Sequence, residues 1–235
     1  MKHSTWTCIL HSFVLLAATT LLSCASTGDR GEEWLPLFDG KTVAGWTMLN
    51  GEPVTGWGVE DGTLTRQKRA GDIYTAEEYD NFVLEFDFKI AAGGNSGVKY
   101  RMKWYGESYL GPEFQILDDI EKTPGRDPVT GKTHWGTAGL YVIDPGDWTV
   151  DPRRPAGEWN HGKIIADGSK FEHWLNGHLI VSIDTSSERY AKGVAASKFR
   201  NRENYGQNPS GRIMLQEHGS GVWFKNIRLR RLPVR

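Results

Sequence analysis

The sequence predicts an all-β protein, a jelly-roll sandwich of two antiparallel sheets. Short segments of alternating apolar and polar residues recur along the chain, and two dipeptides typical of tight hairpin turns, Asp61-Gly62 and Asn176-Gly177, lie between such segments. No long stretch has the periodicity of a helix. With 235 residues, 38% of them hydrophobic, the chain is long enough for one large domain.

The first residues are expected to be a leader that lies outside this fold. Residues 9–22 are mostly apolar but too few for a comfortable membrane span, and Leu21-Leu22-Ser23-Cys24 has the form of a bacterial lipobox. Residues 1–24 are therefore predicted to be a lipoprotein signal peptide ending at Cys24, which becomes lipidated. A plain secretory signal peptide, cut after small residues, is the alternative.

A short polar tether at residues 25–33 precedes the domain, which is predicted to occupy residues 34–235. Both cysteines, Cys8 and Cys24, fall in the leader, so the mature domain has no thiols to pair in a disulfide. We expect a protein held in the bacterial cell envelope, at the periplasmic face or the cell surface, that contacts the membrane only through its lipid. The net charge of -1 gives no reason to expect a nucleic acid partner.

The strands follow from the alternation of side chains. The clearest is at residues 82–90, where apolar side chains on one face alternate with Val83, Glu85, Asp87 and Lys89 on the other. A hairpin is expected over residues 57–64, and residues 137–142 could form one strand inside an otherwise irregular stretch from 118 to 155. Residues 186–209 are also predicted to be irregular. Further strands are expected at 98–104, 113–116, 163–166, 171–175, 179–183, 212–218 and 222–229.

Two of these strands carry polar side chains in mid-strand. In the first, Lys99 and Arg101 alternate with apolar residues, and in the second, Glu113 and Gln115 oppose Phe114 and Ile116. A row of this kind needs hydrogen-bond partners if it is covered, supplied either by solvent or by a polar ligand. The stretch from residue 93 to residue 119 is therefore the first place to look for a binding site.

Ordered motifs from residue 34 to about residue 232 resemble the 3-keto-disaccharide hydrolase family. They are Phe38-Asp-Gly-Lys, Trp57-x-Val-x-Asp-Gly-x-Leu, Gly94-Asn-Ser-Gly-Val, Gln115-Ile-Leu-Asp, Gly157-Glu-Trp-Asn, Glu172-His-Trp-Leu-Asn-Gly, Ser197-Lys-Phe, Leu215-Gln-x-His-Gly and Val222-Trp-Phe. The resemblance implies a concanavalin A-like sandwich that cleaves 3-keto-glycosides, sugars oxidised at C3 by a separate oxidoreductase. The chain departs from the family pattern at Lys99, where an aromatic or aliphatic residue is common, and at Glu217, where Asp is common. The first departure could change what the pocket accepts.

The chemistry implied by this resemblance defines which groups a site needs. A ketone at C3 acidifies the C2 hydrogen, so a positioned base can remove it and the C1 oxygen then leaves by β-elimination. Water can add back to the resulting enone. Such a site requires a base near C2, a donor to the C3 oxygen and an acid near the leaving oxygen. It does not require the two carboxylates of an ordinary glycosidase at fixed spacing.

Strand parity selects Glu113 and His218 as the catalytic base and acid, in either order. Glu113 could instead form a surface ion pair with Arg101, and His218 could be a turn residue before the Gly-Ser-Gly sequence. Arg101 or a second histidine would polarise the keto oxygen, and Gln115 and Gln216 would bind hydroxyls. The full set predicted to bind substrate is Asn95, Arg101, Gln115, Asp118, His134, Trp174, Lys198 and Gln216.

Several of these residues have a structural alternative. Asp118 could cap a loop, Lys198 could anchor one, and His134 could be a solvated loop residue. His173 alternates with apolar residues, which favours a histidine buried in the core. Tryptophans could stack on sugar faces or simply fill the core, and the candidates for stacking are Trp104, Trp135, Trp148 and Trp174.

No cofactor is predicted. The histidines are dispersed without paired metal-ligand spacing, and a calcium site in the carboxylates at 118–121 or 144–147 is less favoured than ordinary loop carboxylates. A conventional endoglucanase is disfavoured because Glu85-Phe-Asp87 lacks the last carboxylate of the expected Glu-x-Asp-x-Glu motif. The second hypothesis for function is a carbohydrate-binding surface lipoprotein that keeps the fold and the aromatic residues without catalysis.

Overall fold

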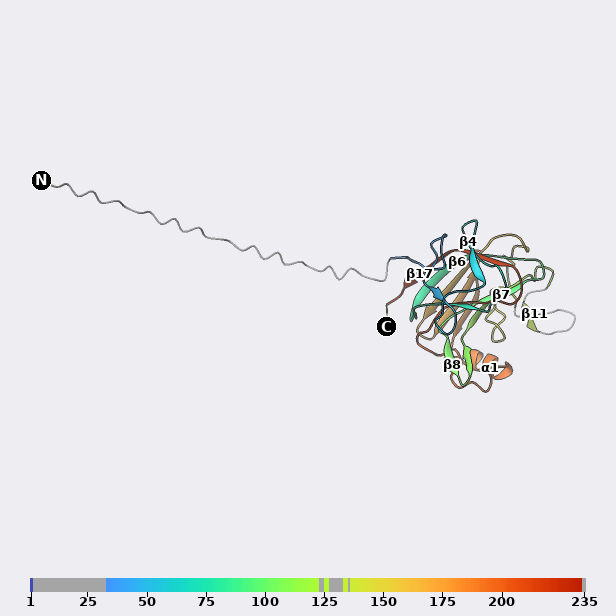
Figure 1. Ribbon diagram of the computed structural model, residues 1–235. Helices are drawn as coiled ribbons and strands as arrows, with labels where there is room; N and C mark the ends of the chain where they lie inside the picture. The colour runs from blue at the N-terminus through green and yellow to red at the C-terminus, as the bar shows by residue number, and fades with distance from the viewer. Residues whose placement is uncertain (2–32, 123–124, 127–132, 135, 234–235) are drawn as a thin grey trace.

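The computed structural model describes Met1 and residues 33–122, 125–126, 133–134 and 136–233. Cys24 and the tether up to residue 32 lie outside the described residues. Two antiparallel sheets lie face to face in the described part of the chain, with one short helix at one end (Figure 1). The predicted β-sandwich is therefore confirmed. No helix within these residues is long and apolar enough to cross a membrane.

The larger sheet has eight strands in the order β15-β14-β13-β6-β17-β4-β3, and β1 also pairs with β17. Its central strands are long, and each predicted segment at 82–90, 163–166, 171–175, 179–183 and 222–229 lies within one of them. The strands are β1 (Leu35–Pro36), β3 (Trp57–Glu60), β4 (Thr63–Arg66), β6 (Phe82–Ile90), β13 (Asn160–Asp167), β14 (Lys170–Leu175), β15 (His178–Asp184) and β17 (Val222–Arg231).

The smaller sheet has five strands in the order β10-β7-β16-β5-β2. Two further strand pairs, β8 with β9 and β11 with β12, stand outside both sheets. The bounds are β2 (Trp46–Thr47), β5 (Ile73–Thr75), β7 (Asn95–Lys99), β8 (Lys103–Tyr105), β9 (Ser108–Leu110), β10 (Glu113–Leu117), β11 (Gly125–Arg126), β12 (Thr133–His134) and β16 (Met214–Leu215).

The core fills the space between the two sheets. Phe86 of β6 meets Phe114 of β10 edge to face at 5.3 Å, and Phe82 meets Tyr100 in the same way at 6.2 Å. Phe82, Phe86 and Phe114 are fully buried because each belongs to the apolar row of its strand, and Tyr100, directly after β7, is buried with them. The polar rows consequently face outward, and the row of the five-stranded sheet is the one that carries the predicted site.

Both predicted hairpin turns are confirmed. Asp61 and Gly62 have φ of 48° and 73°, and Asn176 and Gly177 have φ of 49° and 85°. A type I′ turn needs positive φ at both central residues, which Asp-Gly and Asn-Gly supply at low cost.

Four expectations about elements were wrong. Residues 98–104 do not form one strand, because Arg101 adopts φ of 46° and separates β7 from β8. Residues 137–142 form turns with only an isolated bridge at Leu140, and the 212–218 segment has only β16 in the sheet. Residues 186–209 include a helix, α1 (Glu188–Ala196), which begins where the Ser187 side chain accepts a hydrogen bond from the Tyr190 amide.

Candidate active site

The outer face of the five-stranded sheet brings several predicted residues together. Strands β10 and β7 pair so that Glu113 lies opposite Lys99, Gln115 opposite Gly97 and Leu117 opposite Asn95. Residues directly opposite in an antiparallel pair share a face. Because Phe114 points into the core, Glu113 and Gln115 point outward, as their parity predicted.

Strand β16 adds Gln216 to the same face. Met214 lies opposite Lys99, and two residues further on the Gln216 amide donates to the Gly97 carbonyl at 3.0 Å. Gln115 and Gln216 therefore flank Gly97 from the two neighbouring strands. Asp72, just before β5, accepts a hydrogen bond from the Glu217 amide at 2.8 Å, which places a second carboxylate beside this row.

Gly97 gives the Glu113 side chain its position. A Cβ added at Gly97 would lie 2.4 Å from Oε1 of Glu113, so the carboxylate rests directly against the glycine. Any larger residue at this position would displace it. The last glycine of the Gly-Asn-Ser-Gly sequence is thus needed so that the Glu113 side chain can pack against it.

Glu113 is buried although it is on the outer face, with only 5% of its surface exposed. This burial raises the pKa of its carboxyl group, while the positive charges of Lys99 and Lys198 act in the opposite direction. Nζ of Lys99 lies 3.6 Å from Oε2 of Glu113. Burial also raises the pKa of Asp72. A buried acid with a raised pKa beside an ammonium group is typical of an acid–base site.

Lys198 and Tyr141 border this carboxyl group. The Tyr141 amide donates to the Glu113 carbonyl at 3.1 Å, and Nζ of Lys198 lies 4.6 Å from the centre of the Tyr141 ring. Lys198 directly follows Ser197, the C-cap residue of α1, so the end of the helix sets its position. Its positive charge lowers the pKa of Glu113, so Lys198 lies near that carboxyl group.

Two amide oxygens on this face lack partners. Oε1 of Gln115 and Oδ1 of Asn95 are buried, and neither accepts a hydrogen bond from the described part of the chain. Buried polar atoms in folded proteins nearly always have partners, so unpaired acceptors of this kind indicate a place for a ligand with hydroxyl donors.

His218 lies further along the same segment, beyond Gln216. It is exposed and, with Arg69, Glu217 and Gly219, lines a cavity of about 340 Å³. The nearby Ser220 hydroxyl accepts a hydrogen bond from the Asn95 amide, so this end of the site adjoins Asn95. Four residues of β7, or ~13 Å, separate the row of Asn95 from the row of Lys99 and Glu113.

Arg101 does not belong to this site, which corrects its predicted role. Its backbone conformation turns the side chain away from the row of Lys99, and its guanidinium donates to the carbonyls of Asp80 and Gly168 and to Oδ1 of Asn81. There it lines a separate cavity of about 470 Å³. An ion pair between Glu113 and Arg101 is likewise not formed, because Lys99 takes the place beside Glu113.

Trp174 and Asp118 are also placed elsewhere. Trp174 lies on the outer face of the eight-stranded sheet, where Lys163 lies 4.1 Å from its ring and its indole N–H donates to Glu172. It is therefore on the opposite side of the sandwich from Glu113. Oδ2 of Asp118 accepts a hydrogen bond from the Gly93 amide at 2.7 Å, in keeping with the capping alternative. The side chain of His134 and all of Trp135 lie outside the described residues.

The comparisons with known proteins agree with this architecture. Residues 33–230 match the family described as a 3-keto-alpha-glucoside-1,2-lyase-like domain. The chain belongs to this family. A curated relative in Bacteroides thetaiotaomicron, named 3-keto-disaccharide hydrolase, is 29% identical over 231 residues, which cover 84% of this chain and 78% of that protein.

Two crystal structures from Parabacteroides distasonis, each named a putative glycosyl hydrolase, are also similar to this lyase-like domain. The first is 33% identical and covers 87% of this chain and 95% of its own, with a TM-score of 0.73. The second is 28% identical and covers 85% of this chain and 100% of its own, with a TM-score of 0.64. The predicted family and the prediction of a glycoside hydrolase are thereby confirmed.

Two residues of this site, Lys99 and Asp72, are not among the predicted catalytic or substrate-binding residues, although the departure from the family pattern at Lys99 was expected to change what the pocket accepts. Lys99 is one of the outward-facing polar residues of β7. Strand parity would have placed it beside Glu113 if β7 and β10 had been predicted to pair. Asp72 gives no such signal, because it reaches the site only through the pairing of β5 with β16. Pairing between strands far apart in sequence cannot be derived from local alternation.

His173 is a core residue, which confirms the alternative favoured by its alternation. Its Nδ1 lies 3.0 Å from the Ala138 carbonyl, which can only accept, so Nδ1 carries the proton. Nε2 then accepts from the Tyr100 hydroxyl at 2.9 Å. Complete burial lowers the pKa of His173 to about 4, and the ring is neutral at physiological pH.

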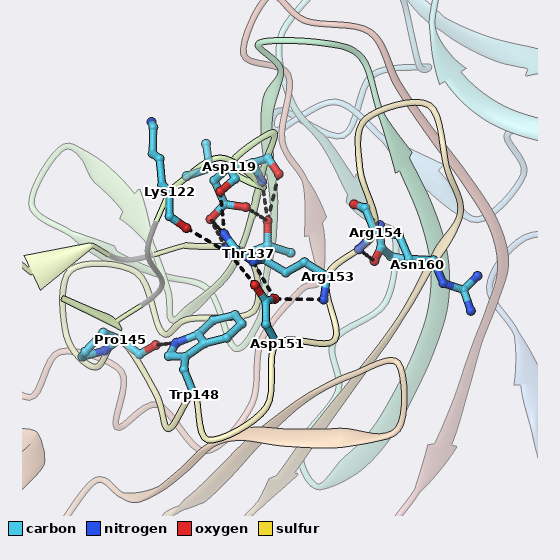
Figure 2. Close-up of polar contacts among 10 residues, drawn as sticks. Asp119, Lys122, Thr137, Pro145, Trp148, Asp151, Arg153, Arg154 and Asn160 are labelled. Atoms are coloured by element: carbon cyan, nitrogen blue, oxygen red, sulfur yellow. Dashed lines mark hydrogen bonds and ion pairs between the residues drawn. The ribbon is translucent and has the colours of Figure 1, made fainter. Parts of the chain in front are cut away.

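A buried polar network holds the segment that flanks β10 (Figure 2). Arg153 donates to the carbonyls of Asp119 and Lys122 and pairs with Asp151 at 2.7 Å, while its Nη1 lies 3.3 Å from the Asp119 carboxylate. Asp119 also accepts from the Thr137 amide at 3.1 Å. The network fixes residues 137–139 against β10.

That flanking segment completes the edge of the site. The Gln115 amide donates to the Gly139 carbonyl, and the Ala138 amide donates to the Gln115 carbonyl at 2.8 Å. Within the described residues, no group of three His, Cys, Asp or Glu side chains is arranged to hold a metal ion. The loop carboxylates of Asp119 and Asp144 accept hydrogen bonds from amides and arginines instead.

Proposed function

We propose that this protein cleaves 3-keto-glycosides, 3-keto-disaccharides among them, by removal of the C2 proton and elimination at C1, followed by hydration of the enone. The observation that carries this proposal is the buried carboxyl group of Glu113, held 3.6 Å from Lys99 on a face with two unpaired amide oxygens. The family and the relative named 3-keto-disaccharide hydrolase support the substrate class.

In the first step Glu113 acts as the base. Its carboxylate takes the C2 proton, and the electron pair of the C2–H bond moves into the enolate of the C3 ketone. The ammonium group of Lys99, assisted by Lys198, stabilises the negative charge that forms on the C3 oxygen. The raised pKa of Glu113 suits it to this role, since a base works best when its pKa is near the working pH.

In the second step the electron pair of the enolate expels the oxygen at C1, which leaves with a proton. His218 remains our candidate for that proton donor, because it is exposed and lies between Gln216 and Ser220, whose hydroxyl accepts from the Asn95 amide. Water then adds its hydroxyl group at C1 of the enone and gives its other proton back to the proton donor, while Glu113 returns a proton to C2. The sum is the hydrolysis of one glycosidic bond, and the ketone is recovered unchanged.

The amides hold the sugar during these steps. Oε1 of Gln115 and Oδ1 of Asn95 can each accept a hydrogen bond from a sugar hydroxyl. Gln216, on the other side of Gly97, is placed to do the same. A ring bound across Gly97 would lie directly over the Glu113 carboxylate.

The first experiment compares wild type with Glu113→Gln on a 3-keto-disaccharide, with release of 3-keto-glucose as the readout. Loss of a general base should lower kcat by about 10²- to 10⁴-fold. Glu172→Gln is the matched control, because Glu172 lies on the outer face of the other sheet and should leave kcat unchanged. Full activity of Glu113→Gln would remove the proposed base.

A second measurement tests the elimination itself. A substrate deuterated at C2 should react more slowly than the protiated one, and products formed in D2O should carry deuterium at C2. Direct displacement at C1 would leave the C2–H bond intact and show neither effect. Binding of keto-sugars without turnover, in a folded protein, would favour the carbohydrate-binding lipoprotein.

We also propose the setting in which this reaction takes place. A 3-keto-glycoside must be formed by an oxidoreductase that converts the C3 hydroxyl to a ketone, so such an enzyme should act before this one. Lipidation at Cys24 would hold this reaction in the cell envelope. Palmitate labelling of the wild type, absent from Cys24→Ala, would support the anchor, and label retained by the variant would exclude it.

A further inference from the structure

An exposed aromatic groove lies on the same side of the sandwich as Glu113 but at the other end of the sheet. Trp104 of β8 is 57% exposed, although large aromatic side chains are usually covered. It forms one wall of a groove of about 550 Å³, a size typical of ligand sites. The other residues that line the groove are Met48, Leu49, Asn50, Glu52, Pro53 and Thr55.

The groove combines apolar and polar groups in the way that a sugar ring requires. Leu49, Met48 and Pro53 supply an apolar floor beside the indole ring, while Glu52 and Asn50 supply a carboxylate and an amide. A pyranose has apolar C–H faces and polar edges, so it can stack on an aromatic ring and be held by such groups at its rim.

One row of side chains connects Glu113 to this groove. The strand register places Glu113, Lys99, Met214, Tyr74 and Thr47 side by side across the five strands. Thr47 ends β2 and leads directly to the groove at Met48 and Leu49. Since neighbouring strands lie ~4.8 Å apart, four spacings put the groove ~19 Å from Glu113 across the sheet.

Aromatic rings continue along this path. The ring of Tyr74 lies 5.8 Å from that of Tyr109, and Tyr109 lies 5.1 Å from Trp104. Arg212 fixes the loop that forms the far wall, because it donates to the carbonyls of Thr75 and Leu49 and lies 5.0 Å over the Tyr74 ring. The surface between Glu113 and the groove is therefore formed by packed side chains and not by a mobile loop.

We propose that the Trp104 groove is a distal subsite that binds a sugar ring of the leaving group, so that the preferred substrates are 3-keto-oligosaccharides and not disaccharides. This inference rests on the proposed function, because it assumes that the oxidised sugar reacts at Glu113. A disaccharide bound at Glu113 cannot extend across ~19 Å. A chain of several rings can do so if it crosses from Lys99 over the partly buried Tyr109, which packs on the buried Met214 and Tyr74, and places its far ring on Trp104.

The test compares kcat/KM of wild type and Trp104→Ala on two substrates of one linkage series, a 3-keto-disaccharide and a 3-keto-tetrasaccharide. Wild type should prefer the longer substrate. Trp104→Ala should lose about two- to tenfold on the tetrasaccharide, through KM, which corresponds to one stacked ring, and should be unchanged on the disaccharide. Trp174→Ala, on the opposite face, is the matched control and should change neither value.

Equal effects of Trp104→Ala on both substrates, or no effect on either, would overturn the distal subsite. If wild type cleaves neither substrate, the proposed function fails. A binding measurement then still tests whether the groove is a sugar subsite. Calorimetric titration with the unoxidised tetrasaccharide should then show binding by wild type that is weakened in Trp104→Ala and retained in Trp174→Ala. No binding by wild type, or equal binding by all three proteins, would overturn the subsite independently of catalysis.

Discussion

The Gly97→Ala variant tests whether activity needs the Glu113 carboxylate in its observed position, and not merely its presence. The added Cβ would lie 2.4 Å from Oε1 of Glu113, whereas ordinary contact needs about 3.4 Å, so the carboxylate must move by about 1 Å. Gly97 has no positive φ and lies in β7, and the group that must move is the end of a flexible side chain, so the fold should accept alanine. The expected change is therefore in the site and not in stability.

A displacement of about 1 Å at a reacting group can cost about 10²-fold in rate. We expect kcat on a 3-keto-disaccharide to fall by about that factor, with a thermal midpoint within a few degrees of wild type. Steady-state kinetics and thermal unfolding on the same preparation measure both quantities. Glu113→Gln and Gly97→Ala combined should be scarcely worse than Glu113→Gln alone, because both changes act on one group.

Gly58→Ala is the matched control for this experiment. Its Cβ would lie 2.5 Å from the Gln67 side chain, so it imposes the same kind of displacement on a flexible polar group of the other sheet. It should leave kcat unchanged. Wild-type kcat in Gly97→Ala would refute the reasoning that the carboxylate must occupy its place over the glycine, and an equal loss in both alanine variants would show that the effect is not local.

Three further predictions follow from the buried charges. Lys99→Met removes a positive charge that lowers the pKa of Glu113, so the acidic limb of the kcat profile should move to higher pH, and a limb that stays in place would contradict the pairing. The pKa of His173 falls from 6.5 to about 4 in the fold, so the unfolded state binds a proton more readily than the folded state. The free energy of unfolding should therefore decline by about 3 kcal/mol as the pH drops from 6.5 to 4. Urea titrations at several pH values should show this decline in wild type and not in His173→Gln. Arg153→Met removes a buried cation that pairs with Asp119 and Asp151 and donates to the carbonyls of Asp119 and Lys122, and it should lower the free energy of unfolding by about 3–5 kcal/mol. Arg154 is exposed, so Arg154→Met should change it by less than about 0.5 kcal/mol, and similar losses in both variants would refute the importance of burial.

Side-chain alternation predicted the residues that share each face wherever a strand is regular. Phe82 to Ile90, His173 in the core and the outward pair of Glu113 and Gln115 all agree with parity, because a strand has a period of two whatever lies around it. The hairpin turns agree for a similarly local reason, since Asp-Gly and Asn-Gly tolerate positive φ.

Local alternation failed where the backbone left the strand. Arg101 and Asn95 have the same parity, yet a single left-handed residue at Arg101 sends its guanidinium to Asp80 and Gly168. The helix α1 was missed because it has only nine residues, too few for its apolar spacing to stand out in an irregular polar stretch, and only Tyr190 of them is buried.

The sequence by itself determined the fold class, the family and the side chains that can share one outer face, because each of these depends on short-range periodicity or on ordered motifs. Only the tertiary structure decided which faces meet. The partners of Glu113 come from β7, from the end of α1 and from the start of β5, and Trp174 was excluded by lying on the other sheet. Strand order and register are set by packing of the whole core, so no local pattern of residues could have placed Lys99, Lys198 and Asp72 around one carboxylate.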